Sequence, residues 1–593
     1  MSHLQNQSGL AMLTNWICKS TACCAAGIVI CLFGLTLLVI TPGYDTNDDP
    51  YMGLVASGYG TVEGPDEHLM YSNVLLGFML KQLYTVAPLV PWYGSYLLLT
   101  QFVSHCLLLY ALLLLKRNFF VVFGYLIFFL GVGTYFLAHL QFTSTAFLIG
   151  LAGLSLILVS LIRDTQETHL PWLKWVGICC LIYASLIRYS SLQMLVLSSL
   201  PLLLVMAWQL YRSVNIKPYL LPATLAVCGV LGARYYDKEY YLQDEAWRDF
   251  LPYYSVIGAL VDSTQIPYFE PTKPAFDEVG WSNFDYWMLR EWVYLDQDKF
   301  SLSRLQQFKE KTDAFNFRKF PQVLHAWIHS AKLTIGHPVF LFCLFATIVF
   351  NHLNQKRTWQ RSIIRWLLFW VGLIMIMLII YLKLPARVLT CLSALPLYFT
   401  LLLNQTDWKT SDETQTASQG GLFKTAVAIL LLGSCFLVWS QKRWSDTLVA
   451  KNTSFKQNLT EMMQLWPDKV FVATWVFPIE TFLSYDNQSE IKDFKFLFLN
   501  GLQHSPHFKN KLQAYQIQSP LDELLETDRL LLIAPKQMVP PLSNYLKEYY
   551  GGNVLLNVKY KGEGFLVYQL TPEKTKSPLK KPDLQSESAS QNL

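Results

Sequence analysis

The segment "LLVITPGYDTNDDPYMGLVASGYG" (Leu37–Gly60) ends a run of apolar residues and then places three carboxylates directly after it, at Asp45, Asp48 and Asp49. The apolar run, from about Thr21 to Thr41, has the ~20 residues that a helix needs to cross a bilayer. It is too long for a signal-peptide core and no small-residue cleavage site follows it, so it is expected to remain as a first membrane helix. The adjacent acids are therefore expected at a membrane surface.

The composition of the whole chain predicts a polytopic membrane protein of mainly α-helical class. The chain has 593 residues, of which 52% are hydrophobic and only 15% are charged, whereas soluble proteins carry about 25% charged residues. Apolar runs of membrane-spanning length recur along the sequence. They predict about eleven spans, at 21–41, 94–115, 118–138, 141–162, 173–189, 191–210, 218–235, 332–351, 362–382, 387–404 and 422–440.

One further apolar segment, 69–90, contains Asn73, Lys81 and Gln82 and has its apolar residues at helical spacing. This pattern favours a helix that lies in the membrane interface. If the segment crossed the membrane instead, the predicted orientation of every later segment would be reversed. The distribution of basic residues supports the interfacial interpretation. With a cytoplasmic N-terminus, the inner loops hold most of the Lys and Arg residues, and the short outer connections hold only Lys81, Arg188, Lys383 and Arg387.

This topology places three polar regions outside the membrane: a first loop at 42–92, a long loop at 236–330, and the region after a membrane module that spans 1–440. The region 441–570 has the strand and helix pattern of a small α/β domain. Strands are expected within 468–476, 494–501 and 529–535, with a closing hairpin over 553–570. The tail, 571–593, is polar and expected to be disordered. All eleven cysteines lie in or beside apolar runs, which excludes a disulfide framework and a cysteine metal site.

The acidic group after the first span has two interpretations. Asp48 or Asp49 could cap a helix that begins at Pro50, because Asp accepts hydrogen bonds from the free N–H groups of a helix start. Capping explains one Asp more easily than a group of acids that continues with Glu63, Asp66 and Glu67. Adjacent carboxylates repel each other, so one can have a raised pKa and act as a base, or both can hold a divalent cation such as Mg²⁺ or Mn²⁺.

An acidic pair after the first span, followed by "PYMGLVASGYG" and an interfacial helix, resembles the GT-C membrane glycosyltransferases. This superfamily includes protein mannosyltransferases, oligosaccharyltransferases, aminoarabinose transferases and arabinosyltransferases. The resemblance covers the order of elements along nearly the whole chain, but its motif is only the two residues Asp48 and Asp49. It implies a GT-C-like bundle with interfacial helices and an outer C-terminal domain. It also implies that one of the two acids is the catalytic base.

The lengths of the loops on the two sides of the membrane indicate which kind of sugar donor the protein uses. The cytoplasmic loops are too short for a nucleotide-sugar domain, so a transferase acting outside needs a sugar carried on a polyprenyl phosphate. Its phosphate needs cations near the outer surface, and the candidates are Arg188, Arg234 with Lys238 beside it, Lys383 and Arg387. Lys383 and Arg387, in one tight turn, form the strongest pair. The alternative for each is a long side chain that reaches from a helix end to the interface.

The long loop is rich in Tyr, Trp and carboxylates. These aromatic residues are ordinary at a membrane interface, yet aromatic faces beside carboxylates also suit a sugar acceptor. Asp262, Asp285 and Glu291 are the candidate acceptor contacts. His68 and His105 are expected to be structural, because neither has a second ligand at metal-binding spacing on its own helix.

Together these patterns predict a membrane glycosyltransferase that transfers a sugar from a polyprenyl-phosphate donor to a cell-envelope polysaccharide, glycolipid or protein. No cofactor is required, although a divalent cation between Asp48 and Asp49 is compatible, and no nucleic acid partner is expected. The expected location is a bacterial inner membrane, with the C-terminal domain on the extracytoplasmic side. Two alternatives remain open: a polysaccharide polymerase or ligase, and a transporter or assembly scaffold without enzymatic activity.

Overall fold

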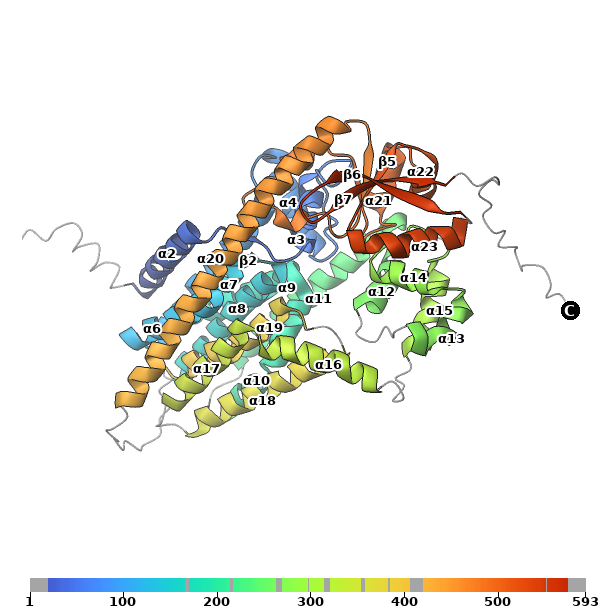
Figure 1. Cartoon of the computed structure of the whole chain (residues 1–593). Coiled ribbons are helices and arrows are strands. Elements are labelled where there is room, and N and C mark those ends of the chain that lie inside the picture. The colour runs from blue at the N-terminus through green and yellow to red at the C-terminus, as the bar shows by residue number, and fades with distance from the viewer. Residues whose placement is uncertain are drawn as a thin grey trace, which may run out of the picture. The chain divides into compact units, whose positions relative to one another are not determined.

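The computed structural model describes most of the chain (Figure 1), namely residues 20–165, 170–213, 217–262, 269–296, 298–313, 320–353, 358–381, 384–405, 420–550 and 552–573. It divides into two compact units. Unit 1 contains Met1–Tyr240, Ala326–Asn452 and Glu480–Ser489. Unit 2 contains Tyr241–His325, Thr453–Ile479 and Glu490–Leu593. Most of the long loop therefore belongs to the same unit as the C-terminal sheet, whereas the sequence placed it with the membrane module.

Unit 1 is built almost entirely of helices. They are α2 (Thr21–Val39), α3 (Asp48–Ser57), α4 (Val74–Val86), α5 (Trp92–Leu115), α6 (Phe119–Phe128), the π-helix η1 (Phe129–Gly133), α7 (Thr134–Ala138), α8 (Phe142–Thr165), α9 (Trp172–Ser198), α10 (Leu200–Ser213), α17 (Pro338–Leu353), α18 (Thr358–Tyr381) and α19 (Ala386–Leu403). Three further helices begin or end in unit 2: α11 (Lys217–Gln243), α16 (Phe320–Ile335) and α20 (Gly420–Leu465). Two short strands, β1 (Gly43–Tyr44) and β2 (His139–Leu140), pair in parallel.

Among the described residues, eight helices are long and apolar enough to cross a membrane, or nine if one bent pair counts as a single span. This confirms a mainly α-helical, multi-pass architecture, with fewer spans than the eleven predicted. The predicted span 332–351 is the bent pair, Trp327–Ile335 and Pro338–His352, whose halves meet at 62°. The predicted span 218–235 lies in α11, which is helical but is not one of the eight.

The two predicted spans 173–189 and 191–210 are separated by a break inside α9 instead of by a loop. Arg188 has extended backbone angles, φ −157° and ψ 101°. A Cβ built on Gly150 of α8 would meet both Ala184, before the break, and Leu195, after it. A straight helix would hold these two residues about 16 Å apart, so the chain folds back at Arg188, close to the predicted boundary.

Helix α4 occupies the segment 69–90, for which an interfacial position was predicted. Its 13 residues span about 20 Å, which is less than the ~30 Å hydrocarbon thickness of a bilayer. Two polar side chains cap its start: Asn73 Oδ1 accepts from the N–H of Leu75 at 3.0 Å, and Asp237 Oδ1 accepts from the N–H of Val74 at 2.7 Å. A capped helix of this length agrees with the prediction that the segment does not cross.

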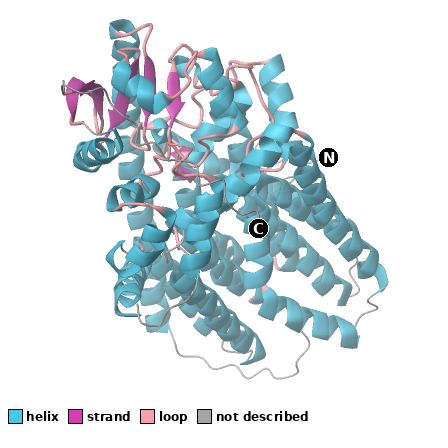
Figure 2. Cartoon of the chain, turned by 90° about the vertical axis from the view of Figure 1, so that its right-hand side faces the viewer, coloured by secondary structure: helices cyan, strands magenta, loops and turns pink. Residues whose placement is uncertain are grey.

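Unit 2 combines helices with one mixed sheet. Its helices are α12 (Glu245–Asp262), α13 (Phe269–Val279), α14 (Asn283–Arg290), α15 (Leu302–Asp313), α21 (Pro506–Ala514), α22 (Pro520–Glu526) and α23 (Val539–Tyr550). The five strands, ordered β4-β3-β5-β7-β6, lie side by side in Figure 2 and are β3 (Val470–Ala473), β4 (Phe496–Phe498), β5 (Leu530–Ala534), β6 (Val554–Lys561) and β7 (Leu566–Pro572). Every predicted strand is present, and β6 and β7 form the predicted hairpin. Residues 574–593, which include most of the predicted tail, lie outside the described ranges.

The segment Glu480–Ser489 belongs to unit 1 and packs closely on the start of α5. A Cβ added at Gly94 would lie only 1.8 Å from the backbone oxygen of Ser484. We therefore expect Gly94→Ala to destabilise the protein by about 1–3 kcal/mol, measured as a lower midpoint of thermal unfolding in detergent. Gly34→Ala in α2, where nothing lies within 4 Å of the added atom, is the matched control. Equal stability of the two variants would contradict this packing.

Candidate active site

Asp49 lies in the first turn of α3, but its side chain does not cap that helix. Asn47 occupies the cap position of α3 and makes no side-chain cap hydrogen bond. Asp49 Oδ1 instead accepts from two other helices: from the hydroxyl of Tyr93 at 3.0 Å and from the backbone N–H of Phe142 at 3.1 Å. Capping of its own helix, the alternative left open by the sequence, therefore does not explain Asp49.

The second carboxylate oxygen of Asp49 has no such partner. The residue is fully buried, and Oδ2 makes no hydrogen bond with any described residue. Leaving a buried acceptor unpaired costs about 1–3 kcal/mol, so an atom of this kind calls for an explanation. A hydroxyl of a bound substrate would satisfy it, and the same oxygen could then take the hydroxyl proton.

The surroundings of Asp49 favour its protonated form. Burial raises the pKa of this carboxyl well above its usual range, and the neighbouring charge of Asp48 raises it further. The hydrogen bonds from Tyr93 and Phe142 and the charge of Arg387 act in the opposite direction but do not cancel the effect of burial. A buried carboxylate with a raised pKa is a stronger proton acceptor than an exposed one, which is the property expected of a general base.

We expect the activity to depend on pH through Asp49, because a general base must be deprotonated to act. The activity should fall as pH drops through the pKa of this carboxyl. Asp48→Asn removes a negative charge that raises this pKa, so the acidic limb should move to lower pH. Tyr93→Phe removes a hydrogen bond to the charged form, so the limb should move to higher pH. A pH profile of kcat/KM tests both shifts, and identical profiles for the two variants would contradict the account.

Two buried polar atoms near Asp49 also have no partner among the described residues: Thr46 Oγ1 and Gln141 Nε2. Gln141 precedes α8 and caps it, since its Oε1 accepts from the N–H of Thr143 at 2.6 Å. Asp49 therefore lies at the N-terminus of α8, where the backbone N–H groups favour negative charge. Unpaired donors and acceptors in one place indicate a site arranged for a polar ligand.

A histidine that the sequence did not single out lies beside this group. The β1–β2 pair aligns Gly43 with His139, and His139 Nδ1 lies 3.3 Å from Asp45 Oδ1. Its Nε2 lies 2.9 Å from Gln441 Oε1, and its ring packs 3.9 Å from the Trp444 ring. Both ring nitrogens of His139 therefore have a partner, and His139 and Asp45 form a pair of interacting side chains. The only sequence signal was a polar residue at the junction of two predicted spans.

Among the candidate phosphate ligands, Arg387 is the one whose charge acts on the pKa of Asp49. It lies in the first turn of α19, which has no side-chain cap, and its charge lowers the pKa of Asp49. Its guanidinium makes no hydrogen bond or ion pair with any described residue. An uncapped helix start with a half-buried arginine is a favourable place for an anion. Lys383, its predicted partner, lies outside the described residues.

The other two predicted phosphate ligands contact aromatic rings. Arg188, at the break in α9, lies over the ring of Phe142 at 4.8 Å, and the N–H of that same residue binds Asp49. Arg188 therefore lies in the neighbourhood of the acid. Arg234 is exposed and lies over the ring of Tyr189 at 4.1 Å, and nothing links it to Asp49 directly.

The three predicted acceptor contacts all lie in unit 2. Asp285 is fully buried, pairs with Lys299 at 3.1 Å and forms a capping box with Ser282; burial raises its pKa to about 6. These contacts give Asp285 a structural role, and its contact with an acceptor stays a prediction. Glu291 is half-buried and accepts from the indole N–H of Trp475 at 2.7 Å. The side chain of Asp262 lies outside the described residues.

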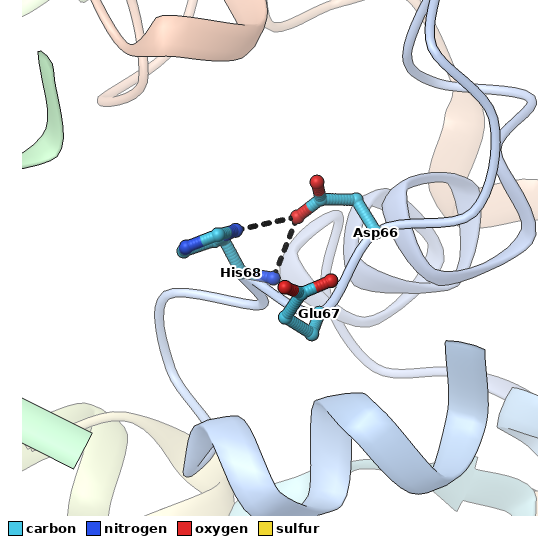
Figure 3. Close-up of side chains that lie close together, drawn as sticks. All are labelled: Asp66, Glu67 and His68. Atoms are coloured by element: carbon cyan, nitrogen blue, oxygen red, sulfur yellow. Dashed lines mark hydrogen bonds and ion pairs between the residues drawn. The ribbon is translucent and has the colours of Figure 1, made fainter. Parts of the chain in front are cut away.

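A second polar cluster follows α3 in the first loop (Figure 3). Within the described ranges, Asp66, Glu67 and His68 form the one group whose potential metal-ligand atoms all lie within 4.8 Å of one another. Asp66 Oδ1 lies 2.8 Å from His68 Nδ1. Both Glu67 oxygens already have donors, from Lys81 Nζ and the hydroxyl of Tyr240, each at 2.6 Å. The lysine already supplies a positive charge to the cluster, so this arrangement fits an ion-pair network better than a metal site. A cation between Asp48 and Asp49 stays a prediction.

No family model and no curated protein matches this chain. Two solved structures of ArnT from Cupriavidus metallidurans are similar to it at 10% sequence identity. The apo structure gives a TM-score of 0.40 over 94% of this chain and 98% of that chain. The structure bound to undecaprenyl phosphate gives 0.38 over 91% and 98%. Because both TM-scores are low, the function proposed for this chain rests on its own residues.

Proposed function

We propose that this chain is a membrane glycosyltransferase that transfers a sugar from a polyprenyl-phosphate donor to a hydroxyl group of a cell-envelope acceptor. The observation that carries the proposal is a buried acid, Asp49, near an arginine, Arg387, whose guanidinium makes no hydrogen bond or ion pair with any described residue. Asp49 keeps one carboxylate oxygen unpaired, and Arg387 acts on it from an uncapped helix start. A base and an anion site in one place are what a displacement at a phosphate-linked sugar requires.

In the proposed reaction, the acceptor hydroxyl oxygen attacks the anomeric carbon of the donor sugar. Asp49 Oδ2 takes the hydroxyl proton as the new carbon–oxygen bond forms. The bond from the anomeric carbon to the phosphate oxygen breaks, and its electron pair leaves on that oxygen. The guanidinium of Arg387 and the first N–H groups of α19 stabilise the negative charge that develops there. One displacement of this kind inverts the configuration of the anomeric carbon.

A cavity among the membrane helices offers room for part of the donor's hydrocarbon chain. It measures about 330 Å³ and lies among α16, α17, α18 and α19. Its walls are mainly apolar, and they include Ile335, Leu344, Val371, Met375, Leu392 and Pro396. Because α19 begins at the proposed phosphate site and then lines this cavity, one helix could contact both the phosphate and the polyprenyl chain.

The acceptor and the compartment remain parts of the proposal. The distribution of Lys and Arg favours a cytoplasmic N-terminus and an extracytoplasmic C-terminal domain. A polyprenyl-phosphate donor outside the membrane favours a bacterial inner membrane. The acceptor would then be an envelope polysaccharide, glycolipid or protein.

The proposal is tested by offering labelled donors to the purified protein in liposomes. The donors are a panel of sugars on polyprenyl phosphate and the same sugars as nucleotide conjugates, with an envelope extract as acceptor. Transfer is expected only from the lipid-linked donors, and unlabelled polyprenyl phosphate should compete with them for binding. Transfer from the nucleotide conjugates alone would contradict the proposal, and so would a protein that neither binds polyprenyl phosphate nor transfers any sugar.

A transporter is the second candidate, because one described span is broken. The helices Trp327–Ile335 and Pro338–His352 meet at 62°, with His337 between them, and transporters often place ligands at broken helices. Such a protein would move the lipid-linked sugar across liposomes without an acceptor, and it would tolerate Asp49→Asn. Donor flipping measured without acceptor therefore separates the two candidates.

A further inference from the structure

Unit 2 contains a cavity of about 200 Å³ that lies entirely within this unit. Its walls come from three places: α12, the start of α15, and the start of α21 with the residues just before it. The lining side chains are Asp249, Phe250, Tyr253, Phe300, Ser301, Leu302, His504 and Lys509. Sites for drug-sized ligands usually measure about 300–1,000 Å³, so this cavity suits a ligand of about one six-membered ring.

Aromatic rings supply the apolar part of the wall. Phe250 and Phe300 are buried, with 3% and 1% of their surfaces exposed, whereas Tyr253 is only partly buried. The Tyr253 ring packs edge-on against the His504 ring at 5.2 Å. His504 Nε2 donates to the backbone oxygen of Tyr294 at 3.0 Å, which fixes that wall. Tyr253 keeps part of its ring exposed, so it is the aromatic surface of the wall that suits the C–H face of a sugar ring.

The polar part of the wall has groups without partners. The hydroxyl of Tyr253 is buried and makes no hydrogen bond with any described residue. A ligand hydroxyl would satisfy it, as buried polar groups require. Ser301 precedes α15, since the N–H of Leu305 donates to its backbone oxygen at 3.0 Å. The first N–H groups of this 12-residue helix therefore lie beside the cavity and favour a negative charge.

Charged side chains stand at the exposed rim. Lys509 is exposed, and its ammonium makes no hydrogen bond or ion pair with any described residue. Asp249 is also exposed, and Arg248 Nε lies 3.9 Å from its Oδ1. The free cation and the helix start together give the cavity one positive side, and Asp249 offers an acceptor for ligand hydroxyls on its rim.

We propose that this cavity binds a single sugar ring that carries a carboxylate, such as a hexuronate unit at the end of a glycan. The sugar ring packs on the exposed part of the Tyr253 ring, its hydroxyls bond to the Tyr253 hydroxyl and Asp249, and its carboxylate is held by Lys509 and the start of α15. A nucleotide is too large for this volume. The inference does not depend on sugar transfer, because it concerns binding in unit 2 alone.

The test is saturation-transfer NMR with the full-length protein in nanodiscs, with glucuronate and glucose as probes at millimolar concentrations. Glucuronate should bind more tightly than glucose. Lys509→Ala should weaken glucuronate binding by about tenfold and leave glucose binding unchanged. Tyr253→Phe should weaken both by about fivefold, since it removes one hydrogen bond without changing the ring.

Lys536→Ala is the matched control, because Lys536 is exposed in unit 2 and does not line the cavity. It should leave the binding of both probes unchanged. The proposal is overturned if neither probe binds, if glucose binds as well as glucuronate, or if Lys536→Ala weakens binding as much as Lys509→Ala. Asp49→Asn should retain full binding, so failure of this site and failure of the transfer reaction can be told apart.

Discussion

Asp49→Asn is expected to lower the rate of sugar transfer by about 10³-fold while the donor still binds. Asparagine keeps the oxygen that accepts from Tyr93 and from the N–H of Phe142, so the fold around α3 should persist. It cannot accept a proton at the position of Oδ2, which is the unpaired atom of Asp49. The rate is measured in a single turnover with donor already bound, so a loss of binding does not count as a loss of chemistry.

Asp48→Asn is the matched control for this variant. Asp48 is adjacent, half-buried and of the same charge, and its main described effect is to raise the pKa of Asp49. Well above that pKa, Asp48→Asn should retain most of the rate. Equal losses in both variants would point to a shared role, such as binding a cation. Full activity of Asp49→Asn would return the search to the polymerase and transporter alternatives.

Arg387→Ala should have the second-largest effect, a loss of about 10²–10³ in the transfer rate. The guanidinium would stabilise the charge that develops on the departing phosphate, and its loss leaves only the helix start to do so. Arg387→Lys should recover part of the rate, because lysine keeps the charge but not the planar pair of donors. The single-turnover rate and the donor affinity are measured separately for each variant.

Arg443→Ala provides the control for the loss of an arginine in unit 1. Arg443 is exposed and lies over the ring of Trp439 at 5.0 Å, so it resembles Arg387 in type but has no link to Asp49. Its replacement should change the rate less than twofold, about 0.4 kcal/mol. If Arg387→Ala were equally harmless, the donor phosphate would have to bind elsewhere, with Arg188 as the next candidate.

Much of the architecture could be predicted because membrane helices and buried strands carry strong local signals. The apolar runs located all eight membrane-length helices, and the strands of unit 2 appear where short apolar runs stand between turns. The long helix α20, drawn in orange in Figure 1, was predicted only for its apolar first part. Its second part is amphipathic, and hydropathy alone does not mark it as a continuation.

The sequence predicted the acidic pair and the candidate cation Arg387, but not the groups that hold Asp49. The acidic pair was visible, but what distinguishes Asp49 from Asp48 comes from Tyr93 and Phe142, which lie 44 and 93 residues away along the chain. His139 and Gln141 reach the site through tertiary pairing, which has no local signal. Asp285 is different: it was predicted to contact the acceptor, although the sequence "SNFD" at 282–285 has the spacing of a capping box, a local signal that the prediction did not use.

The most direct test of the account is the configuration of the anomeric carbon in the product of the wild-type protein. The product made from a lipid-linked donor of known configuration is isolated and its anomeric proton is assigned by NMR. A single displacement with Asp49 as the base predicts complete inversion. Retention of configuration would contradict it, because a single displacement from the side opposite the phosphate cannot retain the configuration.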